Sequence, residues 1–276
     1  MDISINGKPA DITLETEKTL GDVLSGLEGW LEGSEHRISG LQIDGSPIDV
    51  DALTDVFTWE VANIKTVDIR ILSWSELALD AFHHAQEELR VYGNAPFEDH
   101  CRIRKAWEEE AAAHFLAEQI PEIGEWIGKT LEGEGFTSEE MGHLIDERIR
   151  ELTDPAEELK ALGSLVMEVA KRLEDLPLDI QTGKDSKAAE TVHLFSHITE
   201  KLFRILHLLT LAGLVLHDLS IDTLSMHDFI AGFGTSLKEL VTAYEAKDVV
   251  LVGDLAEYEL APRLLKLYAA ISNADY

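Results

Sequence analysis

Residues 202–216 read LFRILHLLTLAGLVL and form the most apolar stretch of the 276-residue chain. A helix that spans a membrane needs about 20 apolar residues, whereas this stretch is shorter and contains Arg204 and His207. A helix that is apolar on nearly every side is typical of the interior of a helical protein. The stretch therefore predicts the central helix of a bundle, around which the later helices of the chain pack.

The segments around this stretch carry the start signals of helices. Ser73 and Glu76 have the spacing of a capping box, and Asp154 followed by Pro155 combines an N-cap with a proline at the first helical position. Pro177 is expected to end the helix that begins there. Apolar residues at helical spacing recur from Ser73 onward without a fixed-period repeat, which predicts about seven or eight helices in one bundle.

The N-terminal quarter of the chain differs from this helical part. Apolar residues alternate with polar ones at Ile3 and Ile5 and again at Ile12 and Leu14, which is typical of half-buried strands. The Asn-Gly pair between the two runs has the sequence of a type I′ turn. We therefore predict a β-hairpin over residues 2–15.

A helix and further strands complete this N-terminal region. Residues 20–31 have apolar positions at helical spacing, and residues 36–43 and 67–72 return to strand character. The order strand, strand, helix, strand, strand resembles the ubiquitin-like β-grasp family, and the opening MDISINGKPADITLETEKTLGDVLSGL is similar to its sulfur-carrier branch. The resemblance implies a small domain used for binding.

The carrier activity of that branch requires a free C-terminal Gly-Gly. Here the last predicted strand runs directly into Ser73-Trp74-Ser75, so the resemblance implies no carrier chemistry for this chain. We therefore predict an α+β fold with two domains, a small β-grasp-like domain at residues 1–72 and a larger all-α helical bundle at residues 73–276.

The charge of the chain is strongly negative, since Lys and Arg number 23, Asp and Glu number 53, and the net charge is −30 at pH 7. Nucleic-acid binding needs clustered Lys and Arg, and anionic membrane surfaces repel such a chain. We therefore expect neither nucleic acid nor a membrane as a partner and favour a protein with a basic surface. The alternative is that the charge keeps the protein soluble or reflects a saline cytoplasm.

The cysteine content and the N-terminus bear on the compartment. Cys101 is the single cysteine, so no disulfide forms within the chain, which is compatible with a reducing cytosol. The opening MDISINGK lacks the basic and apolar regions of a signal peptide. We therefore expect a cytoplasmic protein.

The first candidate metal ligands are Glu190, His193 and His197, which have the spacing of one helical face. A Glu-x-x-His sequence resembles half of the ligand set of carboxylate-bridged di-iron bundles. A second such sequence is missing, and Asp80 with His83 is the nearest substitute. The alternative interpretation is a polar stripe on the exposed side of the helix.

The second candidate pair is His217 with Asp218, which directly follows the apolar stretch. The pair resembles the His-Asp centre of the HD-domain metal phosphohydrolases, which would cast His193 and Asp228 as the further ligands and imply metal-activated water. The residues after the pair depart from the usual Ile-Gly of that family. Alternatively, Asp218 ends the core helix and His217 interacts with the negative end of its dipole.

These observations favour a non-enzymatic binding or adaptor protein that interacts with another protein, with a chaperone-like or regulatory role, and they identify no catalytic or cofactor-binding residues. The alternative function is a metal-dependent hydrolase or oxidase. It would use a divalent metal held in the helical bundle by Glu190, His193, His197, His217 and Asp218.

Overall fold

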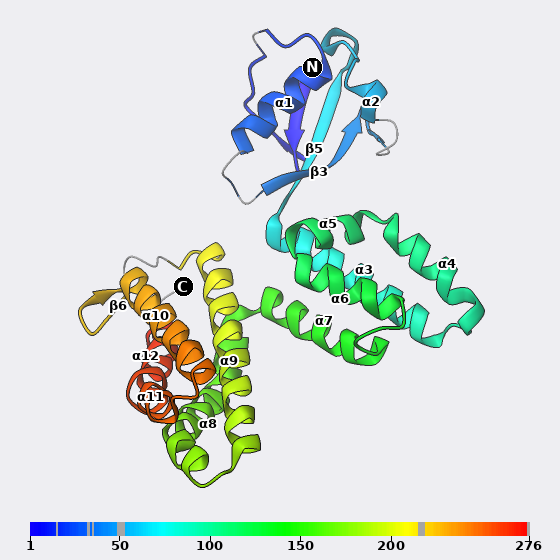
Figure 1. The fold of residues 1–276 in the computed structure, drawn as a ribbon. Helices are drawn as coiled ribbons and strands as arrows, with labels where there is room; N and C mark the ends of the chain where they lie inside the picture. The colour runs from blue at the N-terminus through cyan, green and yellow to red at the C-terminus, as the bar shows by residue number, and fades with distance from the viewer. Residues whose placement is uncertain (15, 32–33, 35, 49–52, 215–218, 275–276) are drawn as a thin grey trace. The chain divides into compact units, whose positions relative to one another are not determined.

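The structure is a computed structural model that describes the whole chain apart from residues 15, 32–33, 35, 49–52, 215–218 and 275–276 (Figure 1). The chain divides into two compact units, Met1–Ile149 and Arg150–Tyr276. The boundary between residues 72 and 73 predicted from the sequence falls inside the first unit, where a strand meets a helix, and it stays a prediction.

The N-terminal unit begins with a five-stranded mixed sheet in the order β2-β1-β5-β3-β4. Strands β1 and β5 are parallel, and the other neighbouring pairs are antiparallel. The strands are β1 (Asp2–Ile5), β2 (Lys8–Pro9), β3 (His36–Ile43), β4 (Ser46–Pro47) and β5 (Thr66–Ser73). A short helix α2 (Leu53–Val56) and a 3-10 turn (Val61–Asn63) precede β5.

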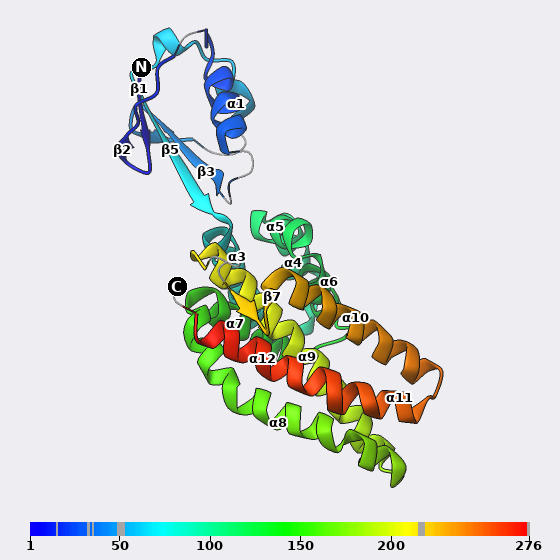
Figure 2. The ribbon, with the colours of Figure 1, turned by 90° about the vertical axis from the view of Figure 1, so that its left-hand side faces the viewer.

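Helix α1 (Leu20–Leu31) covers one face of this sheet (Figure 2). Its apolar stripe is buried against apolar residues of β1, β3 and β5, as the helical spacing predicts. The helix contributes Leu20, Val23, Leu24, Leu27 and Leu31 to this core, and the sheet contributes Ile3, Leu41, Ile43, Val67, Ile69 and Ile71.

The predicted N-terminal hairpin is confirmed at its turn and is wrong beyond it. Asn6 and Gly7 have φ angles of 50° and 73°, as a type I′ turn requires. Pairing continues past Pro9, and the last backbone bond described between these segments runs from the Ala10 N–H to the Ile3 carbonyl at 2.9 Å. The following residues leave the sheet instead of continuing the second strand.

Five helices follow the sheet: α3 (Trp74–Asn94), α4 (Phe97–Glu108), α5 (Ala111–Gln119), α6 (Pro121–Leu131) and α7 (Ser138–Thr153). The predicted capping box of α3 is confirmed, since Ser73 Oγ accepts from the Glu76 N–H at 3.2 Å and Glu76 Oε2 accepts from the Ser73 N–H at 2.8 Å. This box fixes the point at which β5 becomes helix.

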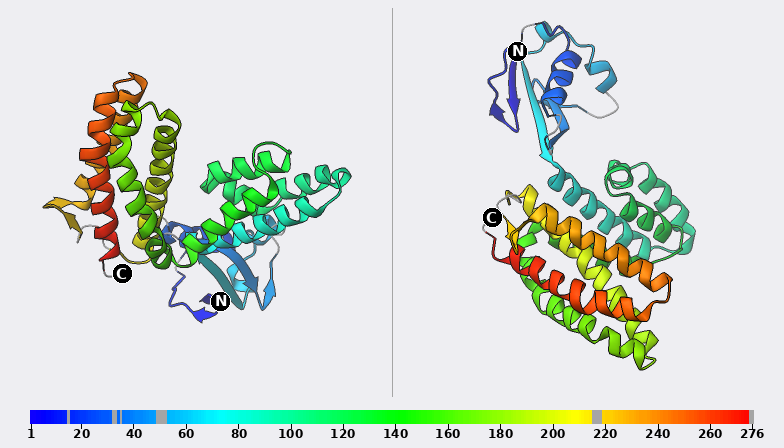
Figure 3. Two further views of the ribbon diagram at one scale, coloured as in Figure 1. Left: turned by 90° about the horizontal axis from the view of Figure 1, so that it is seen from below. Right: turned by 60° about the vertical axis from the view of Figure 1, so that its left-hand side comes forward.

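The C-terminal unit consists mainly of helices. They are α8 (Pro155–Gln181), α9 (Asp185–Leu211), α10 (Met226–Glu245), α11 (Val249–Asp254), a π-helix (Leu255–Leu260) and α12 (Ala261–Ser272). Helices α8, α9 and α12 pack side by side (Figure 3), and a short hairpin of β6 (Ser220–Ile221) and β7 (Leu224–Ser225) precedes α10. The predicted α+β fold class is confirmed, because a small mixed sheet precedes a mostly helical region.

The apolar stretch expected at the centre of the bundle packs through one side only. Leu202, Ile205 and Leu209 of α9 lie in the core, whereas His207 is exposed and Leu208 is half-buried. Residues 202–211 therefore form a one-sided core helix, Leu214 is buried beyond its end, and the last residues of the stretch lie outside the described ranges. None of the described helices combines the length and the apolar character that crossing a membrane requires.

Helix α8 corrects a second expectation. It continues through Pro177 to Gln181 instead of ending at the proline. The proline ring packs against Gly253 of α11, where an added Cβ would lie 3.0 Å from the Pro177 Cβ. A packing contact with a residue distant in the sequence therefore outweighs the local preference of proline to end a helix.

Candidate functional site

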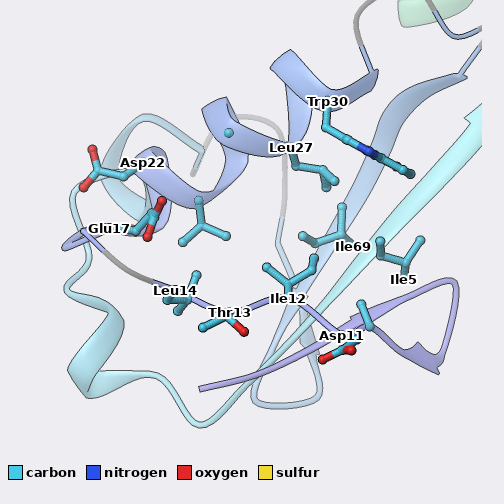
Figure 4. A pocket seen from close by; sticks show the side chains of 13 residues that line it. Ile5, Asp11, Ile12, Thr13, Leu14, Glu17, Asp22, Leu27, Trp30 and Ile69 are labelled. Carbon is cyan, nitrogen blue, oxygen red and sulfur yellow. The ribbon is translucent and has the colours of Figure 1, made fainter.

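A groove lies between α1 and the chain segment that follows β2 (Figure 4). It encloses about 550 Å³, a volume within the range of binding pockets. Its lining comes from both faces, with Ile5 and Ile69 from the sheet, Val23, Gly26, Leu27 and Trp30 from α1, and Ala10, Asp11, Ile12, Thr13, Leu14, Glu17 and Asp22 from the segment and the start of α1. We call this site the α1 groove.

The early end of β2 creates the α1 groove. After Ala10, the backbone groups of residues 11–14 make no hydrogen bond among those that the structure describes. These residues therefore run beside α1 without closing against it, and the Ile12 side chain stays 39% exposed. Across the groove, Trp30 is 73% exposed although it is the largest apolar side chain of α1. Apolar side chains left exposed around a concave surface are typical of interaction sites.

The charge of the α1 groove is entirely negative. Asp11, Glu17 and Asp22 are the charged residues of the lining, which contains neither lysine nor arginine. Figure 4 shows Glu17 and Asp22 near one end of the groove and Trp30 near the other. The groove thus offers an apolar floor with carboxylates at its rim.

The Asp22 carboxylate is fixed by the start of α1. Its Oδ2 atom accepts hydrogen bonds from the N–H groups of Thr19 and Lys18, both at 2.9 Å. These two hydrogen bonds hold the pKa of Asp22 below its ordinary value, and the bond from Thr19 contributes most to this lowering. Asp22 therefore keeps its negative charge at neutral pH and adds to the acidic end of the groove.

The lining of the α1 groove suits binding better than chemistry. Thr13 carries its single hydroxyl group, and the lining includes no histidine, cysteine or lysine. A nucleophile paired with a base is therefore missing among these residues. A ligand with apolar side chains and a positive charge matches what the lining presents.

The structure places three of the predicted metal ligands on the surface of α9. Glu190, His193 and His197 are all exposed, and Glu190 Oε1 accepts a hydrogen bond from Arg172 Nη1 at 2.9 Å. His217 and Asp218 lie outside the described residues. In the described ranges, no group of three or more His, Cys, Asp and Glu side chains is placed to hold a metal ion, and the metal alternative stays a prediction.

A group of buried charges lies in the C-terminal unit, where α7, α8 and α9 meet. Glu151 is only 1% exposed, and its two carboxylate oxygens accept from Arg204 Nε and Nη2 at 3.2 and 3.3 Å. Lys201 Nζ lies 3.0 Å from Glu158 Oε2 and 3.7 Å from Glu151 Oε1. Glu158 Oε1 also accepts from Arg150 Nε at 3.1 Å. Both carboxylates are therefore paired with cations, which indicates a structural role for this group.

Sequence reasoning did not identify the α1 groove. Ile12 and Leu14 were assigned to a paired strand, and Trp30 lies off the apolar stripe of α1. One signal points to the groove in retrospect, because a tryptophan on the polar side of an amphipathic helix has no core to enter.

Comparisons with known proteins match the two parts of the chain separately. A family model described as TP0873 N-terminal domain matches residues 1–73, and a model described as domain of unknown function (DUF8042) matches residues 157–270. An uncharacterized protein of Treponema pallidum (strain Nichols) is 21% identical over 275 residues, which cover 100% of this chain and 98% of that protein. No solved structure matches the chain. The α1 groove lies entirely within the first matched region.

Proposed function

We propose that this protein is a non-enzymatic adaptor whose α1 groove binds an extended segment of a partner protein. The observation that carries the proposal is the apolar groove with its acidic rim beside residues 11–14, whose backbone makes no hydrogen bond among those described. The partner segment carries apolar side chains, which enter the groove, and Lys or Arg residues, which meet the carboxylates. Such a segment belongs to the basic protein partner that the net charge of the chain favours.

The backbone of residues 11–14, which takes part in none of the described hydrogen bonds, explains why the partner segment is extended. A peptide that pairs with these N–H and C=O groups adds a strand beside the domain, and its hydrogen bonds contribute affinity. Alternate side chains of an extended peptide point to the same face. Those facing α1 enter the groove and bury the exposed surface of Ile12 and Trp30.

The acidic rim adds selectivity to this binding. Asp11 and the pair of Glu17 and Asp22 lie apart along the groove (Figure 4), so a partner with basic residues at both ends of its apolar part is favoured. The net charge of −30 raises the association rate with such a partner and disfavours acidic competitors.

The resemblance of residues 1–72 to the ubiquitin-like β-grasp family supports the same function, because that resemblance implies a small binding domain. The observed order β1, β2, α1, β3, β5 is compatible with the order of that family when β4, α2 and the 3-10 turn are left out. The single, exposed Cys101 supports our further proposal that the protein acts in a reducing compartment such as the cytoplasm.

Replacing Trp30 with serine tests the proposal. With the full chain as bait in a lysate of its own source at low salt, a partner retained by the wild type is expected to fall about tenfold or more in Trp30→Ser, since aromatic anchors dominate binding sites. Quantitative mass spectrometry of the captured proteins measures the loss. Trp30 is strongly exposed, so the substitution leaves the core intact.

Phe97→Ser is the matched control, because Phe97 is a strongly exposed aromatic residue of the same unit outside the groove. This variant is expected to retain the partner as the wild type does. Raising the salt concentration is expected to weaken retention, because the rim carboxylates are partly screened. The proposal is contradicted if Trp30→Ser captures the same proteins in the same amounts as the wild type. It is also contradicted if the wild type captures no protein above background.

A further inference from the structure

A second apolar surface lies at one end of the C-terminal unit, around α11. We call it the α11 patch, and it consists of exposed apolar residues at the start of α11 and the end of α10, namely Val249, Val250, Leu251, Val241 and Tyr244. Tyr244 and Val249 line the same cavity, and Val241 lies about one helical turn before Tyr244. Val249, Val250 and Leu251 are consecutive, and Val250 is 67% exposed. A run of exposed apolar residues is costly in water unless another molecule covers it.

The α11 patch borders a cavity of about 420 Å³. Tyr244 and Val249 form part of its exposed edge, and buried residues such as Leu176 and Val252 form its floor. The lining comes from the end of α8, the start of α9, the end of α10 and the start of α11. Figure 2 shows the α8–α9 and α10–α11 turns at the same end of this unit. The cavity is large enough for one or two apolar side chains of an incoming molecule.

The charges beside the patch favour a basic occupant. Glu245, Asp248 and Asp254 are exposed acidic residues in the same stretch of chain, which also contains one exposed basic residue, Lys247. The lysines of the α8–α9 turn, Lys184 and Lys187, are paired with Asp179 at 3.1 and 2.7 Å. A second copy of this chain would bring the same acidic surroundings and a charge of −30 against the patch, which disfavours self-association.

The backbone around the patch favours a helical occupant. The patch residues belong to helices α10 and α11, whose backbone groups are largely paired within each helix. The patch thus offers no strand edge, so an incoming segment must satisfy its own backbone hydrogen bonds. An amphipathic helix does so while presenting a row of apolar side chains.

We propose that the α11 patch is a second docking surface, which takes an amphipathic partner helix with an apolar face flanked by Lys or Arg. The patch lies in the region that matches the second family model, residues 157–270, whereas the α1 groove lies in residues 1–73. The inference goes beyond the proposed function, because it gives the adaptor a separate site through which it holds two segments at once.

A labelled peptide of about 18 residues, with Leu on one helical face and Lys on the other, is a direct probe of this site. Fluorescence anisotropy measures its binding to the full chain. The Val249→Ser/Val250→Ser variant is expected to bind about tenfold more weakly, since it removes apolar contact without changing the charge. Circular dichroism verifies that the variant keeps its helices, and the single Val250→Ser variant is expected to show a smaller loss in the same direction.

Met167→Ser is the matched control, because Met167 is an exposed apolar residue of α8 outside the patch. This variant is expected to bind the peptide with the affinity of the wild type. A peptide with the same composition in scrambled order is expected to bind weakly. Equal affinity of the patch variant and the wild type would show attraction by charge alone and overturn the proposal. The proposal would also be overturned if the wild type did not bind the peptide. The same holds if sedimentation showed dimers of the wild type that the patch variant does not form.

Discussion

The Phe233→Ala variant is expected to lose about 3–5 kcal/mol of the free energy of unfolding of the C-terminal unit. Phe233 is completely buried in α10, and its ring lies 6.3 Å from Phe195, 6.0 Å from Phe203 and 6.5 Å from Phe229. Truncation removes the side chain that joins these three rings and leaves a cavity that the neighbouring helices fill only in part. Urea denaturation followed by far-UV circular dichroism measures the loss.

The control for this substitution is Met167→Ala, which removes an exposed apolar side chain from the same unit. Its effect is expected to stay within about 0.5 kcal/mol, as is usual for surface positions. A Phe233→Ala variant as stable as this control would mean that the aromatic cluster is not the centre of the core.

The Glu151→Ala variant is expected to be destabilised by about 3–5 kcal/mol, because it removes a buried carboxylate that pairs with the half-buried Arg204 and the buried Lys201. Arg204 donates two hydrogen bonds to Glu151 and Lys201 lies between Glu151 and Glu158. Glu151→Gln keeps the shape of the side chain and removes its charge, so it is expected to be destabilised as well. Urea denaturation measures both variants.

Glu157→Ala is the control for the charge substitution. Glu157 pairs with Lys160 at 3.3 Å on the exposed surface of α8, where a single ion pair contributes about 0–1 kcal/mol. If Glu151→Ala and Glu157→Ala had the same small effect, the buried group of charges would not stabilise the junction of α7, α8 and α9. Complete failure of Glu151→Ala to fold, with a folded Glu157→Ala, agrees with the prediction.

Signals that depend on a residue's own backbone predicted the fold well. The Asn6-Gly7 turn and the Ser73–Glu76 capping box are both present, because the geometry of a turn or a helix start is decided within a few residues. The strand and helix order at the N-terminus followed from the same local patterns. The α+β fold class could therefore be predicted from the sequence.

Contacts between distant residues decided the features that the sequence did not predict. Pro177 stays within α8 because it packs against Gly253, and the helix of residues 202–211 leaves His207 exposed. Apolar composition indicates that a helix meets a core, but it does not indicate how many neighbouring helices surround it. Both differences arise from packing rather than from local preference.

The candidate site could not be predicted because it depends on residues 11–14 leaving the sheet, where the structure describes no backbone hydrogen bond for them. Their alternating pattern is typical of a strand, and the pattern does not show that the partner strand ends before them. A basic protein partner stays a prediction from the net charge. The α1 groove adds to this an apolar floor and a direction for the bound segment.

Amide hydrogen exchange of the full chain tests the proposed binding mode most directly, measured with and without the partner captured through the α1 groove. Strand addition predicts that exchange at residues 11–14 slows about tenfold or more when the partner is bound, because the amide groups of these residues then donate hydrogen bonds to the partner. Unchanged exchange at these residues with the partner bound at saturation would contradict the account.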